Sequence, residues 1–269
     1  MKYFIKVLWA EAVEQHRNYF NNWMIYISLF VWPLLSFLSA YYSYSSFNVD
    51  GTLISYINGN NILVFLMLGY MAMSFFRSVV QSAWNFSRER QSGTLEYIYL
   101  STANRLAVLM GNALSSVFES SIVMLNFGLL IVFSNRASIN VNTISLVVVI
   151  FIFIIMALLW WVFLNACFLY SRDTDFLFTI LEEPMEIFSG VKVPIVIFPV
   201  WAKIISFIFP LTYALEAIRQ VMLNGASLQA VSTILFVCLG IIMVLLFATL
   251  ITIVVVEKHM RKTGNVVLF

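Results

Sequence analysis

The stretch SRERQSGTLEYIYLSTANR, residues 87–105, separates two long apolar runs, and it carries three arginines and two glutamates. Of the 269 residues, 62% are hydrophobic and 10% are charged, whereas about a quarter of the residues in a soluble domain are charged. Such a chain has too little polar surface to face water on every side. We therefore predict an all-α polytopic membrane protein, whose apolar runs cross the bilayer as helices and whose polar stretches turn between them.

Five apolar runs are long enough to cross a membrane, because a bilayer core about 30 Å thick needs about 20 apolar residues in a helix. A sixth run is short and contains Pro184, and the apolar segment after it, 191–219, contains three prolines. Prolines break helices, and broken backbone at membrane depth must be covered by protein or line a watery cavity. We expect 191–219 to form short re-entrant helices at the outer side. The six predicted transmembrane helices are 23–42, 62–84, 105–133, 144–170, 176–190 and 228–256.

The distribution of cations predicts that both termini are cytoplasmic. Six spans place eleven Lys and Arg residues, Arg77 among them, on the inner side and four on the outer side, and cytoplasmic loops favour such cations. A seventh span would move Lys258, Arg261 and Lys262 outside. We expect a single transmembrane domain, 1–269, in the cell (plasma or inner) membrane. The net charge of +2 is too small to indicate a nucleic-acid partner.

Residues 1–22 predict an amphipathic helix that precedes the first span. At helical spacing Leu8 and Trp9 fall on one face, and Lys6 and Arg17 fall on the opposite face. Such a helix lies on the cytoplasmic interface with its apolar side in membrane lipid. The alternative is that it packs on the chain's own spans.

The opening stretch predicts a short cytoplasmic helix between spans 2 and 3. A cap near Gly93 begins a helix over 92–102, in which Leu95, Ile98 and Tyr99 share one face. A short helix with an apolar face and flanking charges has the form of a docking element for a soluble partner. The alternative is a solvated turn whose arginines only set the topology.

Two stretches carry a family resemblance. The first is RERQSGTLEYIYLSTANRLAVLMGNAL, residues 88–114, and the second is PLTYALEAIRQVMLNG, residues 210–225, ahead of the last span. The first is similar to the loop of type-2 ATP-binding-cassette (ABC) exporter permeases, in which an acidic–basic pair, a few residues and Gly-Thr-Leu-Glu precede a helix. The second is similar to another signature of the same family. The two signatures stand in the expected order in a chain with six predicted spans, so the resemblance covers essentially the whole chain.

This resemblance implies that 92–102 is a coupling helix seated in a groove of a separate ABC ATPase subunit. It implies a permease subunit that exports a lipid-like, amphipathic or drug- or antibiotic-type substrate, together with a second permease copy or a homologous permease. The chain lacks the Gly-x-x-x-x-Gly-Lys-Ser/Thr loop, so we expect no enzyme activity and no cofactor in it, with ATP and Mg on the partner. An ATPase that is not fused indicates a prokaryotic system. The residues that match the coupling motif are Arg88, Glu89, Arg90, Gly93, Thr94, Leu95 and Glu96.

Four glutamates fall within predicted spans, where an ionisable side chain costs about 2.5–3.5 kcal/mol by insertion scales and is functional by default. In a helix Glu182 and Glu186 share a face, whereas Glu183 points about 100° away. We expect these residues and Glu119 to line a polar translocation path or a dimer interface. The alternative is that they are protonated, or that they pair with backbone groups freed by Pro184.

Four residues near the outer side complete the candidate positions. Glu216 and Arg219 are three residues apart, in a sign order that suits pairing, and we expect them to fix the outer helices to the last span. Pro210 and Tyr213 are expected to shape an outer gate.

Two other functions are compatible with parts of this chain. The Glu-Glu-Pro of span 5 is similar to the paired glutamates of one membrane protease family, but that family needs histidines in its spans, and His16 and His259 lie in terminal segments. A secondary carrier or channel, independent of ATP, is the main alternative. Carriers use repeats whose broken helices meet at the midplane, whereas the broken helices here gather near the outer side. Cys167 and Cys238 lie in apolar runs and indicate neither a disulfide nor a metal site.

Overall fold

The computed structural model describes residues 2–20, 22–45, 62–91, 105–133, 141–170 and 174–263. Across these ranges the chain forms helices joined by turns and contains no strand. The all-α polytopic membrane fold predicted from the sequence is therefore confirmed. The elements are α1 (Lys2–Gln15), the π-helical segment η1 (His16–Phe20), α2 (Trp23–Ser45), α3 (Ile62–Gln91), α5 (Arg105–Phe133), α6 (Thr143–Tyr170), α7 (Thr174–Phe188), the 3-10 turn η2 (Ile195–Ile197), α8 (Val200–Ser206), α9 (Pro210–Asn224) and α10 (Leu228–Thr263).

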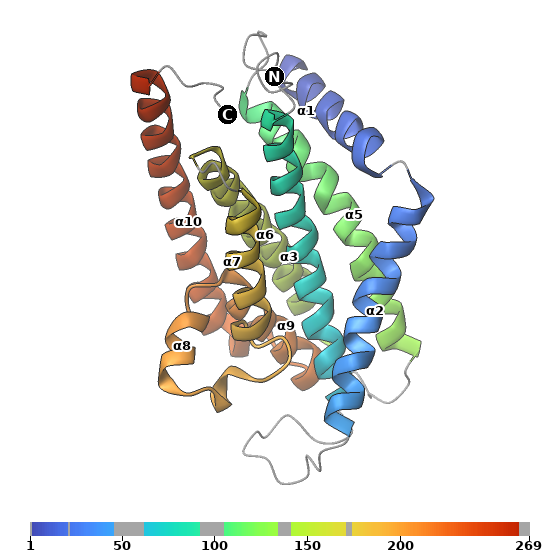
Figure 1. The fold of residues 1–269 in the computed structure, drawn as a ribbon. Helices are drawn as coiled ribbons and strands as arrows, with labels where there is room; N and C mark the ends of the chain where they lie inside the picture. Colours follow the sequence, from blue (N-terminus) through green and yellow to red (C-terminus); the bar gives the residue numbers. More distant parts are fainter. Residues whose placement is uncertain are drawn as a thin grey trace.

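Six helices run side by side and alternate in direction along the chain: α2, α3, α5, α6, α7 and α10 (Figure 1). Helix α3 is the centre of the bundle, because it contacts α2, α5, α6, α7 and α9. Of its most apolar stretch 78% is buried, compared with 11% for α2. Helix α1 and the end of α10 lie at one end of the bundle, and α8 and α9 lie at the other (Figure 1). This arrangement agrees with termini on the same side of the membrane.

Among the described residues, five helices are long and apolar enough to cross a membrane: α2, α3, α5, α6 and α10. Helix α7, the predicted fifth span, has 15 residues, so it is about 22 Å long, which is less than the bilayer core of about 30 Å. Helices α8 and α9 pass the same test only when taken together, as a pair bent by 94°. The part of the chain that the structure describes thus holds five or six candidate spans, and the crossing at 176–190 remains a prediction.

Prolines shape the segment between α7 and α10, where short broken helices were expected. Pro194 and Pro199 stand immediately before η2 and α8, and Pro210 is the first residue of α9. Proline suits these positions because its fixed φ is helical and the missing N–H has no partner in the first turn. Helix α9 ends where Gly225 adopts a left-handed conformation, with φ of 61°.

Two helices extend beyond the apolar runs that predicted them. Helix α3 continues from the predicted end at Trp84 to Gln91, and α10 continues from Val256 to Thr263. In both cases the additional residues are mostly charged or polar, and several are Arg, Glu, Gln or Lys, which are good helix formers. Apolarity therefore marks the part of a helix that suits lipid, and helix propensity decides where the helix ends.

Candidate functional site

An ion-pair network links α3 to α7 inside the bundle. Arg77 of α3 pairs with two carboxylates of α7: its Nε contacts Oε1 of Glu182, and its Nη2 lies 2.8 Å from Oε2 of Glu186. These carboxylates are four residues apart and therefore turn to the same side of the helix. Glu183 is exposed, away from the network. The structure thus brings together two of the three glutamates of α7 that the sequence singled out.

A second cation completes this network. Lys192, in the turn after α7, places its Nζ 2.7 Å from Oε1 of Glu186. Glu186 therefore lies between Lys192 and Arg77, and the network holds two positive and two negative groups. Removing an ion from water costs several kcal/mol, which the partner of opposite charge offsets. Such pairing explains how four ionisable side chains are kept in a largely apolar bundle.

The position of Arg77 changes the count of cytoplasmic cations from which the orientation was predicted. It was counted among the cytoplasmic cations, but it lies inside the candidate span Ile62–Gln81 and faces α7. A cation within a span carries no information about which loops are cytoplasmic. Without Arg77, ten cations remain on the predicted inner side against four outside. The predicted direction of the bias does not change.

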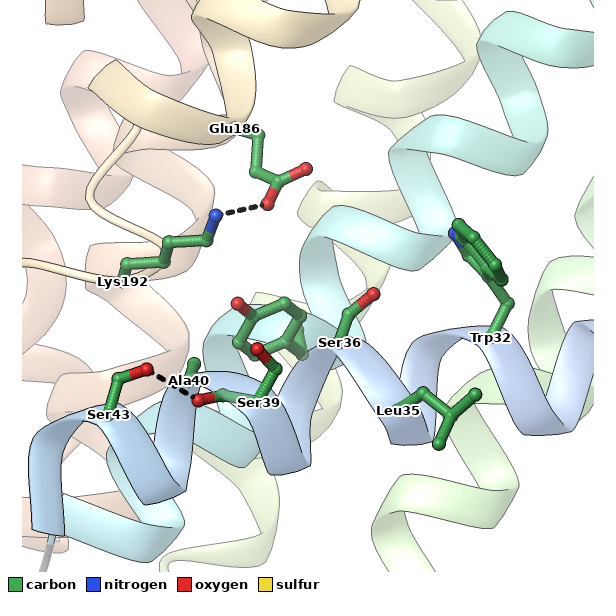
Figure 2. A pocket seen from close by; sticks show the side chains of 9 residues that line it. Trp32, Leu35, Ser36, Ser39, Ala40, Ser43, Glu186 and Lys192 are labelled. Atoms are coloured by element: carbon green, nitrogen blue, oxygen red, sulfur yellow. Dashed lines mark hydrogen bonds and ion pairs between the residues drawn. The ribbon is translucent and has the colours of Figure 1, made fainter.

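A cavity of about 640 Å³ lies beside the network, between α2, α3 and the turn after α7. Its volume falls within the range of small-molecule sites. In Figure 2 the Glu186–Lys192 pair faces Ser43 and Ser39 across the cavity, and Trp32 and Leu35 lie at the opposite end. The cavity thus has a charged, hydroxyl-bearing end and an apolar end. Its lining residues are Trp32, Leu35, Ser36, Ser39, Ala40, Ser43, Tyr70, Glu186 and Lys192.

Arg219 of α9 connects the outer helices to the rest of the bundle. Its guanidinium donates hydrogen bonds to the carbonyl oxygens of Gly190, Val191 and Phe65, at 2.6, 2.9 and 3.3 Å, and lies 3.5 Å from the centre of the Phe65 ring. Gly190 and Val191 follow the end of α7, where carbonyl groups attract a cation. These partners belong to α3 and the turn after α7, whereas we expected Arg219 to hold α9 against the last span.

The other outer positions make local contacts. Glu216 accepts a hydrogen bond of 3.3 Å from Nε2 of Gln220, one turn later in α9. The hydroxyl of Tyr213 donates to the carbonyl of Phe207, and the two rings stack with centres 6.1 Å apart. Pro210 begins α9. These contacts shape the bend between α8 and α9, and the proposed gating role of these residues remains a prediction.

Glycine allows α3 to approach the turn after α7 closely. A Cβ at Gly69 would overlap the carbonyl oxygen of Val191 and would lie 2.9 Å from Nη2 of Arg219. Only a residue without a side chain fits this position. The close contact keeps Arg219 within reach of the carbonyls that it binds.

Another buried carboxylate lies on α5, away from the Arg77 network. Glu119 of α5 is 1% exposed, and its Oε1 lies 3.3 Å from Nδ1 of His16, whose Nε2 lies 3.3 Å from the hydroxyl of Tyr26. The sequence placed His16 in a terminal segment outside the core. The π-helical turn η1 brings its ring onto α5, an arrangement that local sequence does not reveal.

Helix α1 packs on α5, which was the alternative to a purely interfacial helix. Glu11 and Gln15 are buried there, and a Cβ at Gly111 of α5 would lie 2.5 Å from the carbonyl oxygen of Leu8. Trp9 remains 64% exposed. Helix α1 thus docks through a small and polar face, and it leaves part of its apolar face for lipid.

The predicted coupling residues are described only in part. Arg88, Glu89 and Arg90 lie in the last turns of α3, at the same end of the bundle as α1 (Figure 1). The remaining four, Gly93, Thr94, Leu95 and Glu96, lie outside the described residues. Within the described ranges no group of three or more His, Cys, Asp or Glu side chains could hold a metal ion.

Comparison with known proteins gives the family. The sequence model of the ABC-2 type transporter family matches residues 6–223, which is well over half of the chain. A comparison with curated proteins found no match. The match extends from α1 to α9, and it therefore includes the Arg77 network, the cavity and the outer helices. The chain belongs to the ABC-2 type transporter family, and it is a multi-pass transmembrane permease.

Proposed function

We propose that this permease is the membrane-spanning subunit of an ABC exporter, driven by ATP hydrolysis on a separate ATPase subunit. The observation that carries the proposal is the family match over residues 6–223. The arrangement of the bundle supports it. Helix α1, the end of α3 and the start of α5 lie at one end (Figure 1), and in the sequence the Gly-Thr-Leu-Glu motif stands between α3 and α5.

The described contacts provide a route for motion from that end to the cavity. A partner that grips residues 92–102 would move the end of α3 as a rigid body. Arg77 lies 14 residues before Gln91, about 21 Å along α3, and its ion pairs attach α7 to the same helix. Displacement of α3 would therefore shift α7 and the turn at Lys192, which forms one wall of the cavity.

The substrate that we propose is lipid-like, amphipathic or of a drug or antibiotic type. A cavity of about 640 Å³ with a charged end and an apolar end supports an amphipathic molecule. The cavity opens beside α2, which is little buried. A second permease copy, or a homologous permease, would enclose the path. We propose that both termini face the cytoplasm and that the membrane is the cell membrane of a prokaryote.

Affinity purification from native membranes tests this function. We expect an MgATP-hydrolysing activity to co-purify with the tagged permease. We expect Glu96→Arg to reduce the co-purified activity at least about tenfold, which corresponds to a loss of about 1.4 kcal/mol in the free energy of binding. Asp50→Arg is the matched control, because it makes the same charge reversal in a connection predicted to lie outside. Wild-type protein that inserts but brings down no ATPase activity would overturn the proposal.

Reconstitution separates the exporter from its main alternative. A secondary carrier or channel moves its substrate without ATP. The proposed exporter moves substrate in proteoliposomes only when MgATP and the co-purified ATPase are present. Transport by the permease alone would favour the carrier or channel.

A further inference from the structure

We propose that the cavity between α2 and the turn after α7 binds an amphiphile by an anionic, oxygen-rich headgroup, of which a phosphate ester is the simplest example. The inference rests on the proposed function and deepens it, because it names the chemical class of the substrate and the residues that recognise it. Three features of the cavity carry it: the charge at its polar end, the hydroxyls of α2 and the apolar surface at its other end.

The ammonium group at the polar end has hydrogen-bond donors that suit an anion. Lys192 lines the cavity with its side chain 41% exposed, and its ammonium group has three N–H donors, one of which is directed to Oε1 of Glu186. Both oxygens of Glu186 already face cations, because Oε2 accepts from Arg77. The carboxylate is thus occupied, whereas the ammonium group keeps donors for a ligand. Arg77 does not line the cavity.

Hydroxyl groups extend this polar surface along α2. Ser36, Ser39 and Ser43 follow one another at helical spacing and line the cavity. The Ser43 hydroxyl donates to the carbonyl of Ser39 at 2.8 Å, which leaves its oxygen as an acceptor. Helix α2 is little buried. Without a ligand in the cavity, these serines would therefore face apolar lipid. A headgroup that accepts hydrogen bonds provides a partner for the hydroxyl donors of Ser36 and Ser39, whereas Ser43 can only accept, from a protonated headgroup oxygen.

The opposite end of the cavity suits an apolar tail. Trp32 and Leu35 are 63% and 53% exposed, and they lie away from the charged pair in Figure 2. From Trp32 to Ser43 the helix rises about 16 Å, which is the length over which the cavity changes from apolar to polar. Ser43 lies toward the end of the bundle that holds α8 and α9 (Figure 1), so the headgroup points to the predicted outer side.

Titration of the purified full-length permease with two lipids tests this inference. In neutral detergent, native mass spectrometry compares phosphatidic acid with diacylglycerol of the same acyl chains. We expect phosphatidic acid to bind at least about tenfold more tightly. Lys192→Gln should weaken the binding of phosphatidic acid about tenfold and leave the affinity for diacylglycerol unchanged. Lys203→Gln, which removes a cation of α8 outside the cavity lining, should change neither affinity.

A second variant keeps the test decisive if Lys192→Gln does not fold. Ser39→Leu fills the cavity and leaves the network of Arg77, Glu182, Glu186 and Lys192 in place, and it should weaken phosphatidic acid by a similar factor. Equal affinities for the two lipids, or unchanged binding of phosphatidic acid in the folded variant or variants, would overturn the inference. Excess inorganic phosphate should not displace the lipid. If inorganic phosphate alone displaces the lipid, the cavity recognises a soluble anion, and the proposal that it binds an amphiphile is wrong.

This titration can fail separately from the proposed function, because it uses the permease without an ATPase. If ATPase activity co-purifies with the permease but the permease shows no preference for phosphatidic acid, the proposed headgroup site is wrong and the proposed exporter function stands. If the permease prefers phosphatidic acid but no ATPase co-purifies with it, the proposed exporter function is wrong and the proposed binding site stands.

Discussion

The guanidinium of Arg77 in α3 pairs with the carboxylate of Glu182 in α7, and this contact joins the central helix of the bundle to the helix that ends at the cavity. The pair provides the one charged residue of the apolar run 62–84 with a partner of opposite charge. It also connects the two proposed sites. The end of α3 leads to the proposed ATPase contact, and the end of α7 leads to Lys192 and the proposed headgroup site.

The first prediction concerns the stability that this pair provides. Glu182→Gln should lower the free energy of unfolding by about 1–3 kcal/mol, less than the loss for a fully buried pair because the Arg77 side chain is 27% exposed. Glu183→Gln changes the neighbouring, exposed carboxylate and should stay within about 0.5 kcal/mol. Unfolding of the purified variants in detergent measures both. Equal effects of the two substitutions would show that the pair does not hold α3 to α7.

The second prediction concerns the close approach of α3 to the turn after α7. Gly69→Ala should destabilise the protein by about 1–3 kcal/mol, because the added methyl group meets the backbone carbonyl of Val191. Gly128→Ala on α5 is the control, since a Cβ there has nothing within 4 Å. Melting temperatures of the two variants in the same detergent provide the comparison. A stable Gly69→Ala variant would mean that this approach is looser than described.

The third prediction concerns the contact between Glu119 and His16. If this contact docks the N-terminal segment on α5, Glu119→Gln and His16→Ala should be non-additive, with a coupling energy of at least about 0.5 kcal/mol. Glu14, exposed on α1, is the matched control. The cycle of Glu119→Gln with Glu14→Gln should be additive, and so should that of His16→Ala with Glu14→Gln. Additivity of Glu119→Gln and His16→Ala would show that the two side chains do not stabilise each other.

Local pattern was sufficient to predict most of the helices. The predicted span 105–133 coincides with α5 at both ends, because the apolar run begins and ends with the helix. The broken helices between α7 and α10 were also predictable, since Pro194, Pro199 and Pro210 each occupy a position that begins a helix. The family resemblance rested on two short stretches, and the family match extends from α1 to α9.

The contacts of the candidate site required the structure. Arg77 is the one charged residue in the run 62–84, which was a signal for a buried partner, but the sequence does not reveal that the partners lie on α7. His16 is similar, because only the turn η1 brings it to Glu119. Lys192 became a candidate residue only because the structure shows that it lines the cavity. Pairings between distant segments depend on how helices pack, and a single sequence does not encode that arrangement in a local pattern.

The most direct test of the central claim is a crosslink from the predicted coupling helix in native membranes. A photoreactive phenylalanine analogue replaces Leu95, and a parallel variant carries it at Phe47, in a connection predicted to lie outside. We expect light to join position 95 to a polypeptide with a Gly-x-x-x-x-Gly-Lys-Ser/Thr loop, and we expect no such product from position 47. If position 95 reacts only with lipid or with other copies of this chain, the proposed drive by a separate ATPase is wrong.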